Sequence, residues 1–333
     1  MHHKLFVNLL LILAFTIHSP AMAAKVTLSR VDRPDGLYVG NQRLVVTQGT
    51  AFFLYTMPEY GFIGKFGRKG EGPGEFRGRI DHVSFKNDEI IAGSRRKVIF
   101  YATDGEYRRE FMAPSRYGSR YTLLGEGFVG TGLAFDQKRM YQTISIYDQR
   151  LNEVKQIYRT RSPLQRSGNI KIFHAAFDFT VCRDRVFVTG GEDFHIQVFN
   201  RNGEPLSAIT REYDRIDITT EQKEEVLDYF RTLPETRSRF DEIRQRLDIP
   251  SRFPAIRFVY SDDRLVYVQT YTRKAGKTEF FIYDYQGTFQ KRVFLPVVEK
   301  NPIETNPIAL RNNRMYQLVE TPDEEWELRI TDL

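Results

Sequence analysis

Two histidines occupy similar positions in similar segments of the sequence. His82 lies in IDHVSF and His174 lies in IFHAAF, each close to an apolar run. Imidazole is the commonest metal ligand among side chains, and a bound metal turns a water molecule into a nucleophile near neutral pH. Asp81 and Asp35 can add oxygen ligands to the same centre. The histidines therefore define one hypothesis, a divalent-metal hydrolase or lyase, for which a closed site needs three or four ligands.

The other reactive residues indicate structure rather than catalysis. Cys182 is the only cysteine, and its surroundings, FTVCRDR, are typical of a strand with a small buried residue. The glycine-rich segment GEGPGEF (70–76) lacks the Gly-Lys-Ser/Thr ending of a P-loop, so we expect a tight loop there. The sequence contains no Gly-x-Ser-x-Gly motif and no paired-cysteine motif. It therefore does not indicate a covalent nucleophile.

These residues are set within a repeated pattern of strands. Six segments each contain an apolar strand that ends in an aromatic or aliphatic residue, then a turn and a second strand. The residues that end the first strand are Tyr55, Tyr101, Tyr147, Phe199, Tyr283 and Ile330, at spacings of 46, 46, 52, 84 and 47 residues. One propeller blade takes about 40–50 residues, so four of the five spacings fit or nearly fit. The sequence predicts an all-β, six-bladed β-propeller.

Turn residues recur at two places in these units. Tight hairpins need positive φ at their central residues, which favours Asp-Gly and Asn-Gly. Such pairs follow the repeat at Asp104-Gly105 and Asn202-Gly203, with a weaker form at Gln286-Gly287. A second set lies upstream, at Asn87-Asp88, Arg183-Asp184, Asp262-Asp263 and Asn312-Asn313. Each unit is therefore predicted to hold four strands joined by hairpins, which is one blade.

The two ends of the chain are predicted to meet. The last unit stops at Leu333, after its third strand, and Lys25–Val31 is a strand with no partner before it. A shared blade would close the ring and remove two exposed strand edges. We therefore expect the N-terminal strand to complete the last blade.

The longest spacing contains roughly 38 residues more than one typical blade. Thr219 and Gln222 form a capping-box pattern, and apolar residues recur at helical spacing on both sides of Pro234. We predict two amphipathic helices, at about 215–250, between the fourth and fifth blades. Two interpretations remain open. The helices either cover the side of the propeller or form a lid over one mouth of its channel.

Residues 1–23 are typical of a signal peptide. Lys4 precedes an apolar run from Leu5 to Ile17, which is short for a transmembrane helix, and Ala21-Met22-Ala23 fits a cleavage site. We expect the propeller to occupy 24–333, to be periplasmic or secreted, and to lack stable membrane insertion after cleavage. The net charge of +6 favours anionic partners but is too diffuse to indicate nucleic acid.

Two segments resemble a known group of propellers. GKFGRKGEGPGEFRGRIDHVSF (64–85) resembles the NHL-repeat signature, and FPAIRFVYSDDRLVYV (253–268) resembles the strand after a helical insert in exported TolB-like bacterial propellers. The resemblance implies a six-bladed fold and does not imply one activity. Some NHL-like enzymes hold a metal in the channel, at positions such as those of His82 and His174.

The first strands of a propeller line its channel, and we expect ligands to dock where those strands begin. The residues predicted at that mouth are Asp35, Asp81, His82, Arg120, Tyr121, His174, Arg252 and Asn306. The favoured function is a binding module for a protein, peptide or glycan ligand, with an anionic ligand favoured by the charge. The alternative is the metal-dependent enzyme, with His82 and His174 as metal ligands. Otherwise these histidines are ordinary polar residues at a strand edge.

Overall fold

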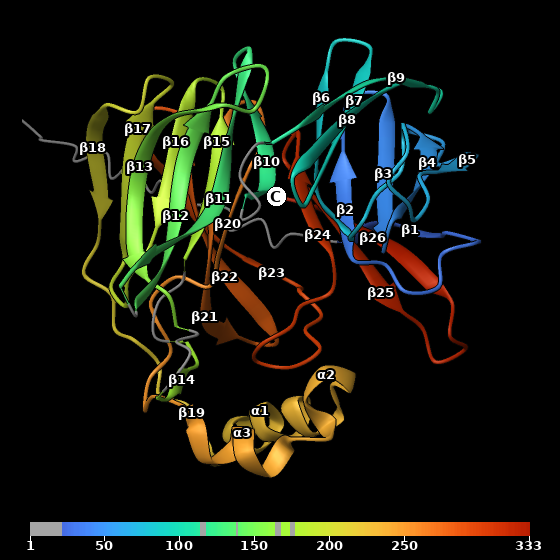
Figure 1. Ribbon diagram of the computed structural model, residues 1–333. Helices are drawn as coiled ribbons and strands as arrows, with labels where there is room; N and C mark the ends of the chain where they lie inside the picture. The colour runs from blue at the N-terminus through green and yellow to red at the C-terminus, as the bar shows by residue number, and fades with distance from the viewer. Residues whose placement is uncertain (1–21, 114–117, 138, 164–167, 174–176) are drawn as a thin grey trace, which may run out of the picture.

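The computed structural model describes residues 22–113, 118–137, 139–163, 168–173 and 177–333. Six four-stranded antiparallel sheets are arranged as the blades of a propeller (Figure 1). The predicted signal peptide lies outside the described residues except for Met22 and Ala23, which begin the first strand. Among the described residues, no helix combines the length and the apolar character needed to cross a bilayer.

The blades follow one another along the chain, and each runs from an inner to an outer strand. The inner strands are β2 (Gly36–Val39), β6 (Ile80–Lys86), β10 (Ser119–Leu124), β15 (Asp178–Cys182), β20 (Phe258–Ser261) and β24 (Ile308–Arg311). The second strands are β3 (Arg43–Gln48), β7 (Glu89–Ser94), β11 (Gly127–Asp136), β16 (Arg185–Thr189), β21 (Leu265–Lys274) and β25 (Arg314–Glu320). The third strands are β4 (Ala51–Thr56), β8 (Lys97–Ala102), β12 (Arg139–Tyr147), β17 (His195–Asn200), β22 (Lys277–Asp284) and β26 (Trp326–Asp332). The outer strands are β5 (Phe62–Phe66), β9 (Tyr107–Met112), β13 (Glu153–Arg161), β18 (Pro205–Thr210), β23 (Phe289–Leu295) and β1 (Met22–Thr27).

The six residues that mark the sequence repeat have equivalent positions in the blades. Each is buried on a third strand. The pairing with the outer strand shifts register beside each of them, as between Leu54 and Tyr55 in blade 1 and between Ile282 and Tyr283 in blade 5. Such β-bulges increase the local twist of a sheet. The following hairpins have the predicted positive φ, which is 94° at Gly105. The repeat therefore marks one bulged pairing of the third and outer strands in every blade, which is a hairpin in blades 1–5 and the closing pair β26–β1 in blade 6.

The ring is closed as the sequence predicts. β1 pairs antiparallel with β26, with Val26 opposite Leu328, and so supplies the outer strand of blade 6. The inner strands of the first and last blades, β2 and β24, lie side by side like those of the other neighbouring blades. Beyond β1, the indole Nε1 of Trp326 donates to the carbonyl oxygen of Asp32 at 2.7 Å. Residues almost three hundred positions apart in the sequence are thus joined at one seam.

The predicted helices lie between blades 4 and 5. They are α1 (Thr220–Thr232), the one-turn α2 (Pro234–Arg237) and α3 (Phe240–Arg246). The capping box is present at the start of α1, because the Gln222 amide donates to Thr219 Oγ1 at 3.2 Å and the Thr219 amide donates to Gln222 Oε1 at 3.0 Å. After α3, the short β19 (Leu247–Asp248) pairs in parallel with β14 (Ile170–Lys171), which lies between blades 3 and 4.

The seam can be tested with Trp326→Phe. The substitution keeps an aromatic ring in a site that is 3% exposed but leaves the Asp32 carbonyl without its donor. We expect the free energy of unfolding in urea to fall by about 1–3 kcal/mol. Arg314→Ala is the control, because it removes an exposed ion pair of the same blade, and it should cost at most about 1 kcal/mol. Equal effects of the two variants would contradict a stabilising role for the seam.

Candidate functional site at the mouth

We call the end of the propeller axis at which the six inner strands begin the mouth. Because strands alternate in direction within each blade, the links between blades and the hairpins between second and third strands lie at this end. Two of these hairpins, β11–β12 and β21–β22, are built from longer strands than the others. The helical insertion is one of the links between blades and lies at the same end, at the bottom of Figure 1. The largest additions to the ring are therefore gathered at the mouth.

Blades 1 and 2 bring two rings together at the mouth. Tyr38 on β2 and His82 on β6 meet edge to face, with ring centroids 5.3 Å apart. The Tyr38 hydroxyl donates to the carbonyl oxygen of Asp81 at 3.2 Å, and both rings are half-buried. Burial raises the pKa of Tyr38 to about 12. Its hydroxyl is therefore a hydrogen-bond donor at neutral pH.

Blade 3 contributes a guanidinium group. Arg120 pairs with the carboxylate of Asp178 on β15 and donates from Nη2 to the Phe179 carbonyl at 2.9 Å. Its φ is 50°, and the register of β10 with β11 shifts between Ser119 and Thr122, so its side chain leaves the strand at a bulge. A non-glycine residue in this backbone region is uncommon and strained, and such residues cluster at functional sites.

The charge of Arg120 acts on its neighbours. Burial, with a further contribution from Arg120, lowers the pKa of His82 to about 3, so this imidazole is neutral near pH 7. Burial raises the pKa of Asp81 against the opposing effect of nearby arginines. Burial also disfavours the charged form of Arg120, but Asp178 keeps the pKa of the guanidinium above its ordinary value. The mouth thus combines a charged arginine with a neutral histidine.

The carboxylate of Asp178 also links blade 4 to blade 5. Asp178 Oδ2 accepts a hydrogen bond from the Val259 amide at 3.3 Å. One residue further along β20, the half-buried Tyr260 donates to Gln269 Oε1 at 3.1 Å. Burial raises the pKa of Tyr260, so its hydroxyl also remains a donor. Five consecutive blades therefore place polar or aromatic side chains around the mouth.

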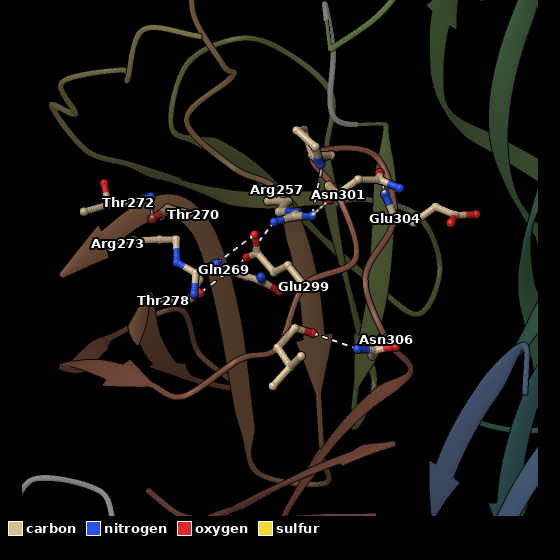
Figure 2. Close-up of polar contacts among 12 residues, drawn as sticks. Arg257, Gln269, Thr270, Thr272, Arg273, Thr278, Glu299, Asn301, Glu304 and Asn306 are labelled. Atoms are coloured by element: carbon tan, nitrogen blue, oxygen red, sulfur yellow. Dashed lines mark hydrogen bonds and ion pairs between the residues drawn. The ribbon is translucent and has the colours of Figure 1, made fainter. Parts of the chain in front are cut away.

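A buried ion pair fixes the link between blades 5 and 6. Arg257, whose side chain is 2% exposed, contacts Glu299 at 2.6 Å, and Arg273 contacts the other oxygen of Glu299 at 3.2 Å. Arg257 Nη2 also donates to the Asn301 carbonyl at 3.2 Å. Figure 2 shows Arg257 and Glu299 pointing toward each other beside the segment from Asn301 to Asn306. Separating this pair would leave an uncompensated buried charge, which is costly. The pair therefore holds the link between blades 5 and 6 in place.

The structure brings together part of the set predicted from the sequence. Asp81, His82 and Arg120 lie close to one another, as the effect of Arg120 on the other two shows. Asp35 is exposed just before β2, and its carboxylate accepts a hydrogen bond from a turn amide of the same blade. His174 lies outside the described residues.

Tyr121 points away from the mouth. Its side chain is 1% exposed and packs edge to face on Tyr147, with centroids 5.2 Å apart. The bulge at Arg120 explains this position, because two consecutive residues there oppose one residue of β11 and the side-chain alternation is broken.

Arg252 and Asn306 support links between blades. Arg252 is exposed and pairs with Asp217 at 2.9 Å where the helical insertion leaves the ring. Asn306 is 4% exposed and donates to the carbonyl oxygen of Val298 at 3.1 Å. Both residues come shortly before an inner strand in the sequence, as predicted for the mouth. Their side chains, however, hold the connecting segments together.

Sequence reasoning missed Tyr38, Asp178 and Tyr260. Each lies on an inner strand, and along β2 half-buried residues alternate with buried ones. Alternate residues of a strand face opposite sides of the sheet. The side chains at every second position of an inner strand therefore share one face, and this alternation is the sequence signal that could have identified these three residues. Arg257 precedes β20 and carries no such signal, because its burial depends on Glu299 in another segment.

Two other reactive features have structural roles. Cys182 is fully buried, and burial raises the pKa of its thiol to about 12, so it stays protonated. In the glycine-rich loop, the Gly72 amide donates to Glu75 Oε2 at 2.8 Å and the Gly74 amide donates to Glu110 Oε2 at 3.0 Å. These amides are bound to carboxylates of the protein itself, so they do not form a phosphate cradle.

Comparison with known proteins supports the fold. No family model matches the chain, and no curated protein matches it. A protein from Bacteroides fragilis that is described as exported has a TM-score of 0.58 and 14% identity, over 92% of this chain and 93% of that one. A member of the DUF4221 family from Bacteroides vulgatus has a TM-score of 0.49 and 8% identity, over 94% and 97% of the two chains. The β-propeller domain of Cps50 (Swd1) from Myceliophteria thermophila has a TM-score of 0.41 and 10% identity, over 94% and 99%. The first similarity supports the fold alone, and the other two are too low to support a structural conclusion.

The metal hypothesis can be tested by chelation. Among the described residues, no three His, Cys, Asp or Glu side chains are grouped as a metal site, and His82 lies beside the cation Arg120. We expect the melting temperature of protein purified without chelator to be unchanged after chelator is added. A ligand bound only to the folded state, at a hundredfold excess over its dissociation constant, adds about 2.7 kcal/mol. A drop of several degrees that one divalent ion restores would therefore favour the metal site.

His82 should make stability depend on pH. Its pKa is about 3 in the folded protein and 6.5 ordinarily, so the unfolded chain binds a proton first as the pH falls. This contribution to stability is complete above pH 6.5 and is lost as the pH falls toward 3. Between pH 7.5 and 5.5 the loss is about 1 kcal/mol, in a window above the titration of ordinary carboxylates.

His82→Gln cannot bind this proton, so its urea midpoint should fall less than that of the wild type across the same window. His195→Gln is the matched control, because His195 is exposed, and it should follow the wild type. Parallel curves for the wild type and His82→Gln would show that the imidazole is not held neutral by the fold.

Proposed function

We propose that this protein is an exported binding module whose ligand docks at the mouth. The observation that carries the proposal is the meeting of side chains from successive blades, with Tyr38, His82, Arg120 and Asp178 linked by direct contacts or by charge. Binding sites are concave, with aromatic surfaces and a few fixed polar groups. The rigid blades hold these groups in place, as recognition requires.

The chemistry of the mouth suits recognition of a polar ligand. Half-buried Tyr38 and Tyr260 offer ring surface together with a hydroxyl donor. The Arg120–Asp178 pair offers donors and an acceptor whose directions are fixed by the bulge and by the neighbouring backbone. A protein segment, a peptide or a glycan can use such a surface, and the net charge of +6 favours an anionic example.

Export forms part of the same proposal. Residues 1–23 have the features of a signal peptide, which supports a periplasmic or secreted protein. The segment 64–85, with its NHL-like pattern, supports a place among exported propellers of the NHL or TolB-like type. The buried and protonated Cys182 suits an oxidising compartment, since it is not available to form a disulfide.

The proposal can be tested with a glycan array and a displayed peptide library as defined probes. The double variant Arg120→Ala/Asp178→Ala removes the pair without leaving one buried charge unpaired. We expect it to weaken the apparent affinity for retained probes about tenfold or more, which corresponds to the loss of roughly one charged hydrogen-bonding pair.

Arg314→Ala/Asp332→Ala is the matched control. It removes an ion pair of the same kind, with an Nε–Oδ1 distance of 2.8 Å, at the opposite end of the propeller axis. Affinity should be unchanged in this variant. Retention of no probe by the wild type, or equal losses in the two double variants, would argue against a ligand site at the mouth.

A further inference from the structure

The helical insertion is attached to the ring through a narrow stem. The segments on either side of the helices pair through two backbone hydrogen bonds, from the Ile218 amide to Ser251 O at 2.8 Å and from the Phe253 amide to Ile216 O at 2.9 Å. After the helices, β19 pairs with only two residues of β14, and Arg246 Nε donates to the Gly168 carbonyl at 3.1 Å. This side of the insertion is therefore tied to the link between blades 3 and 4.

The far side of the insertion reaches another part of the ring. Tyr229 on α1 and Glu304, in the link between blades 5 and 6, line the same cavity. Burial raises the pKa of Tyr229, with a further contribution from the charge of Glu304. The tie to Gly168 on one side and the cavity shared with Glu304 on the other place the helices over the mouth rather than along the side of one blade. Figure 1 agrees, because the helices lie beyond the starts of the inner strands.

Glu304 is held in place independently of the insertion. Its amide donates to Asn301 Oδ1 at 2.8 Å, and the Asn301 carbonyl accepts from the buried Arg257. Figure 2 shows Glu304 at the edge of this group, pointing away from it. The backbone at Glu304 is thus fixed by the ring, and its exposed side chain faces the same cavity as Tyr229 of α1.

The helices themselves bury little. Within α1–α3, every residue of which is described, Val226 is the only buried side chain. A cavity of about 450 Å³ separates α1 from the ring, lined by Glu225 and Tyr229 on one side and by Asn301 and Glu304 on the other. Segments with few buried apolar contacts open at lower free energy than the core of the same protein.

From these contacts we infer that the insertion is a hinged lid over the mouth. Its hinge is the stem together with the β14–β19 pairing, and its latch is the approach of Tyr229 to Glu304 across the cavity. When the latch is released, α1 moves away from the link between blades 5 and 6 and the mouth is exposed. Only the identity of the ligand that the lid would admit depends on the proposed function. The movement of the lid itself can be measured without a ligand.

Thiol labelling provides the test. The only native cysteine is buried, so the background should be low. His82→Cys places a thiol at the mouth, and Glu106→Cys places one in an exposed turn of the same blade at the opposite end of the axis. With a bulky maleimide, Cys at 82 should react about tenfold or more slowly than Cys at 106, because access requires local opening.

Two changes should remove this protection. Tyr229→Phe removes the hydroxyl on the α1 side of the latch and keeps the aromatic ring, and replacing 219–250 by a short turn removes the lid while the paired stem is kept. Either change should raise the labelling rate at position 82 several-fold and leave the rate at 106 unchanged. If the deletion variant does not fold, Tyr229→Phe decides the question. Equal rates at position 82 with and without the latch would overturn the lid, and probe binding at the mouth would be unaffected by that result.

Discussion

The pairing of β1 with β26 is the constraint on which the rest of the structure depends. It makes the first described strand the outer strand of the last blade and leaves β24 beside β2. Only in a closed ring do the six inner strands begin around one axis, and only then do side chains from different blades meet. Arg120 and Asp178 are far apart in the sequence and come from different sheets. Their contact is a consequence of the ring rather than of any local motif.

The ring has a plain end and an elaborated end. The turns between first and second strands are short at one end, whereas the insertion, the long hairpins and the glycine-rich loop lie at the other. At the elaborated end of blade 3, Arg120 has a positive φ at a bulge that directs its side chain out of the strand. Strain of this kind persists only where its surroundings enforce it. Here the enforcing contacts are the carboxylate of Asp178 and the carbonyl of Phe179.

The sequence predicted the architecture better than the site, for a physical reason. The blade repeat, the closing strand and the capping box at Thr219 depend on local patterns of apolar, turn and capping residues, and all three are confirmed. The mouth depends on the direction of single side chains. The bulge at Arg120 turns Tyr121 into the core, and a count of positions from the start of a strand cannot foresee it. Arg257 is buried through a partner 42 positions further along the chain, a contact that no local pattern encodes.

The position of Trp326 has a consequence for spectroscopy. It is the only tryptophan of the chain, and its indole lies at the seam, bonded to the backbone that follows β1. Indole emission therefore reports on blade 6 alone, whereas far-ultraviolet circular dichroism reports on all six blades together. If the seam opens before the rest of the ring, the two signals will change at different denaturant concentrations. The chain thus carries an intrinsic probe at the place where its first and last strands meet.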